Sequence, residues 1–100
     1  MVKVELPAAV RRLAGLAAPE VALEVAAPVT LSGVLDAIEA AYPALRNTLR
    51  DPASGERRPF IRFYANEEDL SHLAAGAELP LEVSTGAVPL LVIAAIAGGA

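Results

Sequence analysis

The single histidine of the chain lies among carboxylates, in the segment whose residue types most suggest metal or acid–base chemistry. Glu68, Asp69 and His72 stand at i, i+1 and i+4, which would put Glu68 and His72 on one face of a helical turn. A transition-metal site needs further nitrogen or sulfur ligands, and the chain has one histidine and no cysteine. We therefore interpret the cluster as a solvated turn, in which His72 caps or bonds locally, and expect no metal.

The same residue counts bear on catalysis. A chain without cysteine has no disulfide and no thiolate nucleophile, and one histidine does not allow a set of nucleophile, base and orienting group. Ser32-Gly33 and Ser54-Gly55 have no lysine at the spacing of a phosphate-binding loop. We expect the protein not to be an enzyme and to need no cofactor.

Five arginines are close together in the middle of the sequence: Arg46, Arg50, Arg57, Arg58 and Arg62. Two interpretations stay open, a set of solvated surface charges or an electrostatic contact to an acidic partner protein. Nucleic-acid binding fits poorly, because the net charge is −4 and there is no tryptophan.

The chain ends with Ile96, Ala97, Gly98, Gly99 and Ala100. Two adjacent glycines after an apolar strand make a narrow tail without side chains, which is able to enter a closed active site. The simpler interpretation of such an ending is a frayed terminus.

The hydrophobic periodicity predicts the elements that must hold this tail. Alternating apolar residues predict strands at 2–6, 20–25 and 60–65, and the first two can form a hairpin. Leu31, Val34, Leu35, Ile38 and Tyr42 form one apolar face of a helix that Thr30 caps and Pro43 ends. Residues 8–19 are expected to be a connection with at most one helical turn, 66–69 a polar turn, and 81–83 a further strand. The apolar run 90–93 predicts a central strand buried on both faces.

Length and composition allow one domain. A chain of 100 residues with 55% apolar residues supports one packed core. The N-terminus shows no signal peptide, and the longest uncharged stretch, 87–100, is too short to span a membrane. We expect a cytoplasmic protein.

Four segments, in order, resemble a known family. They are Thr30-Leu31 to Tyr42-Pro43-Ala44-Leu45, Phe60 to Leu70 with Asn66-Glu67-Glu68-Asp69, Leu79-Pro80-Leu81, and Val92 to Gly99. This set is similar to the ubiquitin-like β-grasp sulfur carriers of the MoaD/ThiS family. The resemblance implies an α+β fold, a mixed four- to five-stranded sheet covered by one main helix. Residues 1–97 would form the β-grasp domain, and 98–100 a flexible Gly-Gly-Ala tail.

The resemblance also implies a function. An E1-like adenylating enzyme would activate the carboxylate of Gly99, and a sulfur donor would convert it to a thiocarboxylate. An acceptor synthase would then take the sulfur for molybdopterin, thiamine or cysteine biosynthesis. Ile96, Ala97, Gly98 and Gly99 would contact these partners, while Gly99 would carry the sulfur.

The sequence departs from the family pattern at its end, where Ala100 follows the two glycines. The carrier function therefore requires a C-terminal peptidase that removes Ala100. The alternative is a non-catalytic ubiquitin-like interaction module that is not activated.

Overall fold

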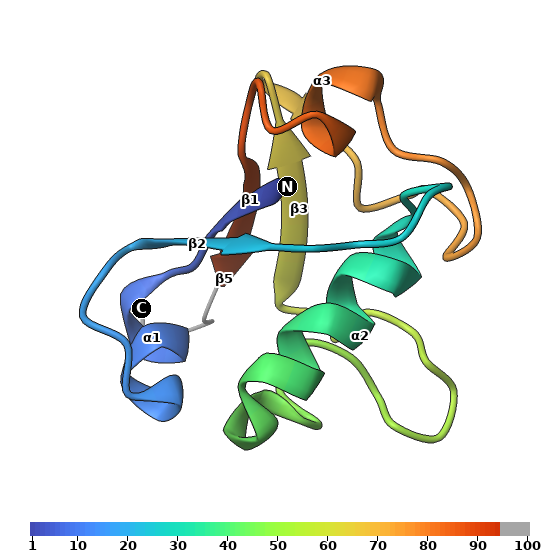
Figure 1. Cartoon of the computed structure of the whole chain (residues 1–100). Coiled ribbons are helices and arrows are strands. Elements are labelled where there is room, and N and C mark those ends of the chain that lie inside the picture. Colours follow the sequence, from blue (N-terminus) through green and yellow to red (C-terminus); the bar gives the residue numbers. More distant parts are fainter. Residues whose placement is uncertain (95–100) are drawn as a thin grey trace.

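The computed structural model describes residues 1–94, and in them a mixed sheet is covered by helices on one side (Figure 1). The strands and helices follow in the order β1 (Val2–Glu5), α1 (Ala8–Ala14), β2 (Glu20–Leu23), α2 (Leu31–Ala41), the 3-10 helix η1 (Pro43–Leu45), β3 (Ile61–Ala65), β4 (Glu68–Asp69), α3 (Leu81–Ser84) and β5 (Leu90–Ala94). The strand order across the sheet is β2-β1-β5-β3-β4. This arrangement confirms the predicted α+β fold, and its five strands agree with the predicted mixed sheet of four to five strands.

The two N-terminal strands form the predicted hairpin. β1 and β2 are antiparallel, with Val2 opposite Leu23 and Val4 opposite Val21. These four side chains are buried, while the residues between them are exposed, as the period of two requires. The hairpin thus has one core face and one open face.

The last strand lies at the centre of the sheet, as its apolar sequence predicts. β5 runs parallel to β1 and antiparallel to β3. The prediction that it is buried on both faces is wrong: Leu90 and Val92 are buried, Leu91 is half-buried, and Ile93 is 42% exposed. The helices cover the sheet on the Leu90 and Val92 side, so the other side chains of β5 face solvent.

Helix α2 supplies the layer over the core face of the sheet. The Thr30 hydroxyl accepts a hydrogen bond from the Gly33 N–H at 3.0 Å, which confirms the predicted N-cap. Its apolar face, Leu31, Val34, Leu35 and Ile38, is buried against the sheet. Pro43 ends the helix and begins η1, and the chain then places Leu45 and Leu49 in the core.

Three local predictions need correction. Residues 81–83 are not a strand but the start of α3, where the Val83 and Ser84 N–H groups donate to the Pro80 carbonyl. Residues 8–19 contain a seven-residue helix, α1, which ends at Gly15 with φ 71°. Within the polar segment 66–69, Asn66 and Glu67 make a tight turn with positive φ, and Glu68–Asp69 is the short edge strand β4.

Residues 1–94 share one sheet and one hydrophobic core, which the predicted single domain requires. The predicted boundary between 97 and 98 lies outside the described residues. In the described part of the chain, no helix is long and apolar enough to cross a membrane.

Candidate functional site

The predicted site residues Ile96, Ala97, Gly98 and Gly99 lie outside the residues that the structure describes. What the structure describes is the point from which they extend, since β5 ends at Ala94. Ala94 lies opposite Ile61 of β3, at one end of the central strand. The described part of the chain therefore ends on the central strand of the sheet.

Beside this point, the open face of the sheet carries apolar side chains. Ile93 lies opposite Arg62, and Leu91 lies between Tyr64 of β3 and Glu5 of β1. Ile93 is exposed, and Leu91 and Tyr64 are half-buried. We call these three side chains, Tyr64, Leu91 and Ile93, the open-face patch. The patch continues into the groove described next, and a contiguous exposed apolar surface with a polar rim is a mark of interaction sites.

A groove of about 370 Å³ continues the open-face patch toward the N-terminal strand. Its lining is mainly apolar and includes Leu6, Pro7, Pro19 and Ile93, and it reaches Ala94 itself. Glu5 and Arg11 also line it. The groove thus lies directly beside Ala94, the last described residue of β5.

Arg11 has a structural role at this groove. Its Nε donates to the Leu6 carbonyl at 3.1 Å. The Leu6 N–H donates to the Pro19 carbonyl, but Pro19 has no N–H to return the bond. Arg11 supplies the missing donor and ties α1 to the end of β1.

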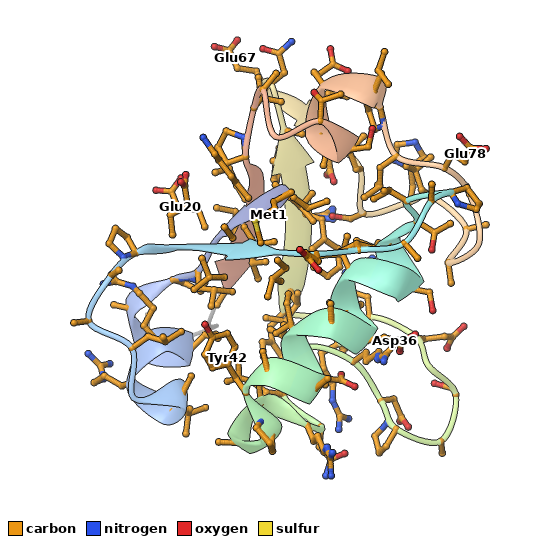
Figure 2. The ribbon with its side chains drawn as sticks, viewed as in Figure 1. Met1, Glu20, Asp36, Tyr42, Glu67 and Glu78 are labelled. Atoms are coloured by element: carbon orange, nitrogen blue, oxygen red, sulfur yellow. The ribbon has the colours of Figure 1, made fainter. Side chains whose placement is uncertain are left out.

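Among the five clustered arginines, Arg50 is held by α2. Its guanidinium donates to Asp36 and to both carboxylate oxygens of Glu39, at 3.0 and 2.9 Å for the latter (Asp36 is labelled in Figure 2). Hydrogen bonding to Glu39 is the largest cause that raises the pKa of Arg50 above its usual value, although burial opposes it. Arg50 therefore pins the loop after α2 to the helix.

The other arginines of the cluster are also engaged within the fold, apart from the exposed Arg46. Arg57 donates to the carbonyls of Ser71 and Ile61, and Arg58 to that of Asn47. Arg62 forms an ion pair with Asp69 at 3.6 Å. These contacts count against a basic docking surface, and they give four of the five arginines a structural role beyond that of solvated surface charges.

The cluster of Glu68, Asp69 and His72 does not assemble as a helical face. Glu68 and Asp69 belong to β4, and His72 follows in an exposed loop. Asp69 accepts a hydrogen bond from the Ser71 N–H at 2.8 Å, and bonding to the side chain and backbone of Ser71 lowers the pKa of Asp69. Within residues 1–94, no group of three histidines or carboxylates could hold a metal ion.

A second hollow of about 250 Å³ lies on the α2 side of the molecule, with Leu31, Leu35 and Phe63 in its lining. Arg50 and Arg57, which also line it, already bond to other groups of the fold. This hollow is closed by the loops 54–57 and 73–75 rather than by the open face of the sheet. We regard the open-face patch and its groove as the candidate site.

Sequence reasoning missed the open-face patch because the run 90–93 is apolar throughout. The available signal was the single apolar stripe of α2, since one helix covers only one face of a sheet. A central strand with one covered face must expose every second side chain.

The order of elements, the parallel pairing of β1 with β5 and the covering helix α2 define the ubiquitin-like β-grasp fold of the MoaD/ThiS class of small sulfur carriers. SAMP1 from Haloferax volcanii matches with a TM-score of 0.72 and 26% identity, over 97% of either chain. CysO from Mycobacterium tuberculosis matches with a TM-score of 0.73 and 26% identity, over 96% of this chain and 100% of CysO.

A chain in the BexX/CysO complex from Amycolatopsis orientalis gives a TM-score of 0.75 over 99% of this chain and 100% of its own, and at 23% identity it shows the fold. No protein-family model and no curated protein sequence matches. The resemblance to the sulfur-carrier class is confirmed by these structural neighbours, which are small carriers rather than catalysts.

Proposed function

We propose that this protein is a sulfur carrier whose reactive group is the carboxylate of Gly99. The observation that carries the proposal is the position of Gly98-Gly99 just beyond the central strand of a carrier fold. Gly99 follows Ala94 by five residues (99 − 94), so a fully extended chain would place Gly99 at most about 18 Å from Ala94, which neighbours the open-face patch. An enzyme that holds this face can receive Gly99 in its active site.

The chemistry needs nothing from the carrier except the carboxylate. A Gly99 carboxylate oxygen attacks the α-phosphorus of ATP in an E1-like enzyme, and pyrophosphate leaves. Hydrosulfide supplied by the sulfur donor then attacks the carbonyl carbon, the C–O bond to the phosphate breaks, AMP leaves, and loss of the sulfur-bound proton gives the thiocarboxylate. Glycine suits this step, because the tail meets no side-chain obstruction in a closed site.

The remaining partners follow from the chemistry of the product. A thiocarboxylate sulfur is a nucleophile, so the consumer is an acceptor synthase with an electrophilic substrate, as in molybdopterin, thiamine or cysteine biosynthesis. A peptidase must cut after Gly99 to expose its carboxylate. Ile96, Ala97 and Gly98 would lie in the channel of each partner, and we place the pathway in the cytoplasm.

A direct test compares the full chain with a chain cut after Gly99. The cut chain should support ATP–pyrophosphate exchange with the E1-like enzyme of its own host, while the full chain should not. With a sulfur donor present, the intact mass of the cut chain should increase by the replacement of one oxygen with sulfur. Protein isolated from the native host should end at Gly99, and a fraction of it should carry the thiocarboxylate.

A matched pair of glycine variants makes this test specific. Gly98→Ala in the cut chain should slow the exchange at least about tenfold, because a methyl group obstructs the channel. Gly76→Ala is the control, since a methyl group there meets nothing within 4 Å. No exchange by the cut chain would contradict the carrier function.

The second candidate function, an interaction module that is not activated, has support from the open-face patch. Such a patch binds a partner whether or not the tail reacts, and the BexX/CysO complex shows that a CysO protein associates with another protein. This alternative would be favoured if the protein isolated from host cells with a high sulfur demand is full-length and unmodified.

A further inference from the structure

Two glutamates lie directly opposite each other on the open face of the sheet. Glu5 of β1 pairs with Glu20 of β2, and both side chains are exposed (Glu20 is labelled in Figure 2). The next pair along the two strands is Leu6 and Pro19, and it is the hydrogen-bonded kind, because the Leu6 N–H donates to the Pro19 carbonyl. Glu5 and Glu20 therefore form a non-hydrogen-bonded pair, in which the side chains are closer together. Like charges at such a position destabilise the sheet.

Neither carboxylate of this pair has an ion-pair partner within 4 Å among residues 1–94. Among residues 1–94, the ion pairs within 4 Å involve Arg50, Arg58 and Arg62, and none includes Glu5 or Glu20. Arg11, the arginine that lines the groove, donates its Nε to the Leu6 carbonyl. Lys3 lies on the same face but opposite Ala22.

The carboxylate pair borders the apolar part of the site. Glu5 is the neighbour of Leu91 across the parallel pairing of β1 and β5. It also lines the groove that contains Leu6, Pro7 and Ile93. One continuous surface thus offers two adjacent negative charges and, beside them, an apolar hollow.

We propose that Glu5 and Glu20 select the partner of this surface: a protein that presents an arginine or lysine next to an apolar side chain. The cation would lie between the two carboxylates and the apolar side chain in the groove. Charge-assisted hydrogen bonds to both carboxylates relieve the repulsion that the isolated protein retains. The inference rests on the proposed function, and the partner is then the E1-like adenylating enzyme.

This proposal expects a basic partner surface, whereas the arginine cluster alone would suggest an acidic one. Arg50, Arg57, Arg58 and Arg62 bond within the fold, so an acidic partner surface would meet few free cations there. On the open face, Glu5 and Glu20 outnumber Lys3, and Arg62 pairs with Asp69, so the local charge has the same sign as the net charge of −4. Complementarity therefore requires a basic partner surface.

The test uses Glu20→Gln in the chain cut after Gly99, with Glu24→Gln as the control. Glu24 is exposed and follows β2, so its substitution removes one negative charge outside the opposed pair. In the free protein, Glu20→Gln should raise Tm by a few °C at low salt, and the gain should shrink as salt screens the repulsion. Glu24→Gln should give a smaller change.

In ATP–pyrophosphate exchange, Glu20→Gln should raise the KM for the carrier about tenfold with kcat nearly unchanged. The loss of affinity should come mainly from a lower association rate constant, and it should diminish at high salt. Equal KM values for the Glu20→Gln and Glu24→Gln chains would overturn the inference and leave the carrier function intact. If the unsubstituted cut chain is not activated, the proposed function fails, and with it the enzyme as the partner.

Discussion

Gly86 shows how one residue fixes the turn before the central strand. Its φ of 81° lies in the left-handed region, and a Cβ at this position would lie 2.4 Å from the Met1 carbonyl oxygen. Gly86→Ala should therefore lower the free energy of unfolding by about 2 kcal/mol or more, from backbone strain and from displacement of the N-terminal residue. Denaturant unfolding measures this loss.

Gly55 provides the matched control for this prediction. Its φ is 73°, but a Cβ there meets nothing within 4 Å. Gly55→Ala should thus cost only the strain, about 1 kcal/mol. Equal losses for the two variants would show that the contact with Met1 contributes nothing.

Glu67 is a residue whose replacement should stabilise the protein. It occupies the second position of the turn between β3 and β4 with φ 66°, where glycine is preferred. Glu67→Gly should raise the free energy of unfolding by about 0.5–1 kcal/mol, since it removes the strain of a left-handed glutamate. The first turn residue, Asn66, tolerates its φ of 50°, so Asn66→Gly should change stability less. A loss in Glu67→Gly would contradict the strain argument.

At the residue scale, the sequence predicted what depends on neighbours in the chain. Thr30 as N-cap and the stripe from Leu31 to Ile38 follow from local spacing, and both are confirmed. The close approach of Gly86 to Met1 brings together two residues that are 85 positions apart (86 − 1) in the sequence. Nothing near Gly86 in the sequence indicates that contact, so it was not predictable.

Among the elements, the loop after α2 depends most on a single side chain. Arg50 is 14% exposed and bonds to Asp36 and Glu39, which are three residues apart (39 − 36) and therefore neighbours on the surface of α2. Arg50→Lys should lower the free energy of unfolding by about 1–3 kcal/mol, because one ammonium group cannot reproduce the planar fork. Thermal and denaturant unfolding would show it.

Arg46→Lys is the control for this change, since Arg46 is exposed and makes no ion pair within residues 1–94. It should leave stability within about 0.5 kcal/mol of the unsubstituted protein. A similar effect of the two substitutions would mean that the Arg50 network is too solvated to stabilise the loop.

The elements that were wrongly predicted share a physical cause. Residues 81–83 have strand-like composition, but Pro80 precedes them and tertiary packing buries Val83 alone, so a short helix forms. The apolar run of β5 predicts a buried strand, but it does not show whether other elements cover one face of the sheet or both. In both cases the deciding contacts come from distant segments.

Across the whole molecule, two carboxyl groups link stability to pH. Hydrogen bonds from the Ala53 and Ser54 N–H groups lower the pKa of Asp51, and bonds to Ser71 lower that of Asp69. Since the folded pKa lies below the unfolded value of about 3.8, the stabilisation is complete above that pH and is lost as pH falls through the lowered pKa.

Asp69→Asn should therefore flatten the decrease of Tm between about pH 5 and pH 2. Asparagine keeps the side-chain oxygen that accepts from the Ser71 N–H, so the change isolates the charge. Glu24→Gln removes a carboxyl that accepts no hydrogen bond within the described residues, and its Tm should fall with pH as steeply as that of the unsubstituted protein. An unchanged slope in Asp69→Asn would contradict the linkage.

At this scale, the resemblance of four ordered segments to the sulfur carriers predicted the fold, and the structural neighbours confirm it. Periodicity alone left the parallel pairing of β1 and β5 open, because two strands at opposite ends of a chain carry no local signal of their contact. The role of Gly98 and Gly99 stays a prediction, since these residues lie outside the described part.

The central position of β5 has a consequence for biosynthesis. A nascent chain interrupted before Leu90 carries β1 with β2 and β3 with β4, but not the strand that joins them. Two-stranded hairpins are at best marginally stable in water, so such a fragment remains exposed to proteases. A stable domain therefore forms only after β5, the strand that precedes Gly98-Gly99 in the sequence, has been synthesised. Chains truncated before this strand should be degraded rather than accumulate.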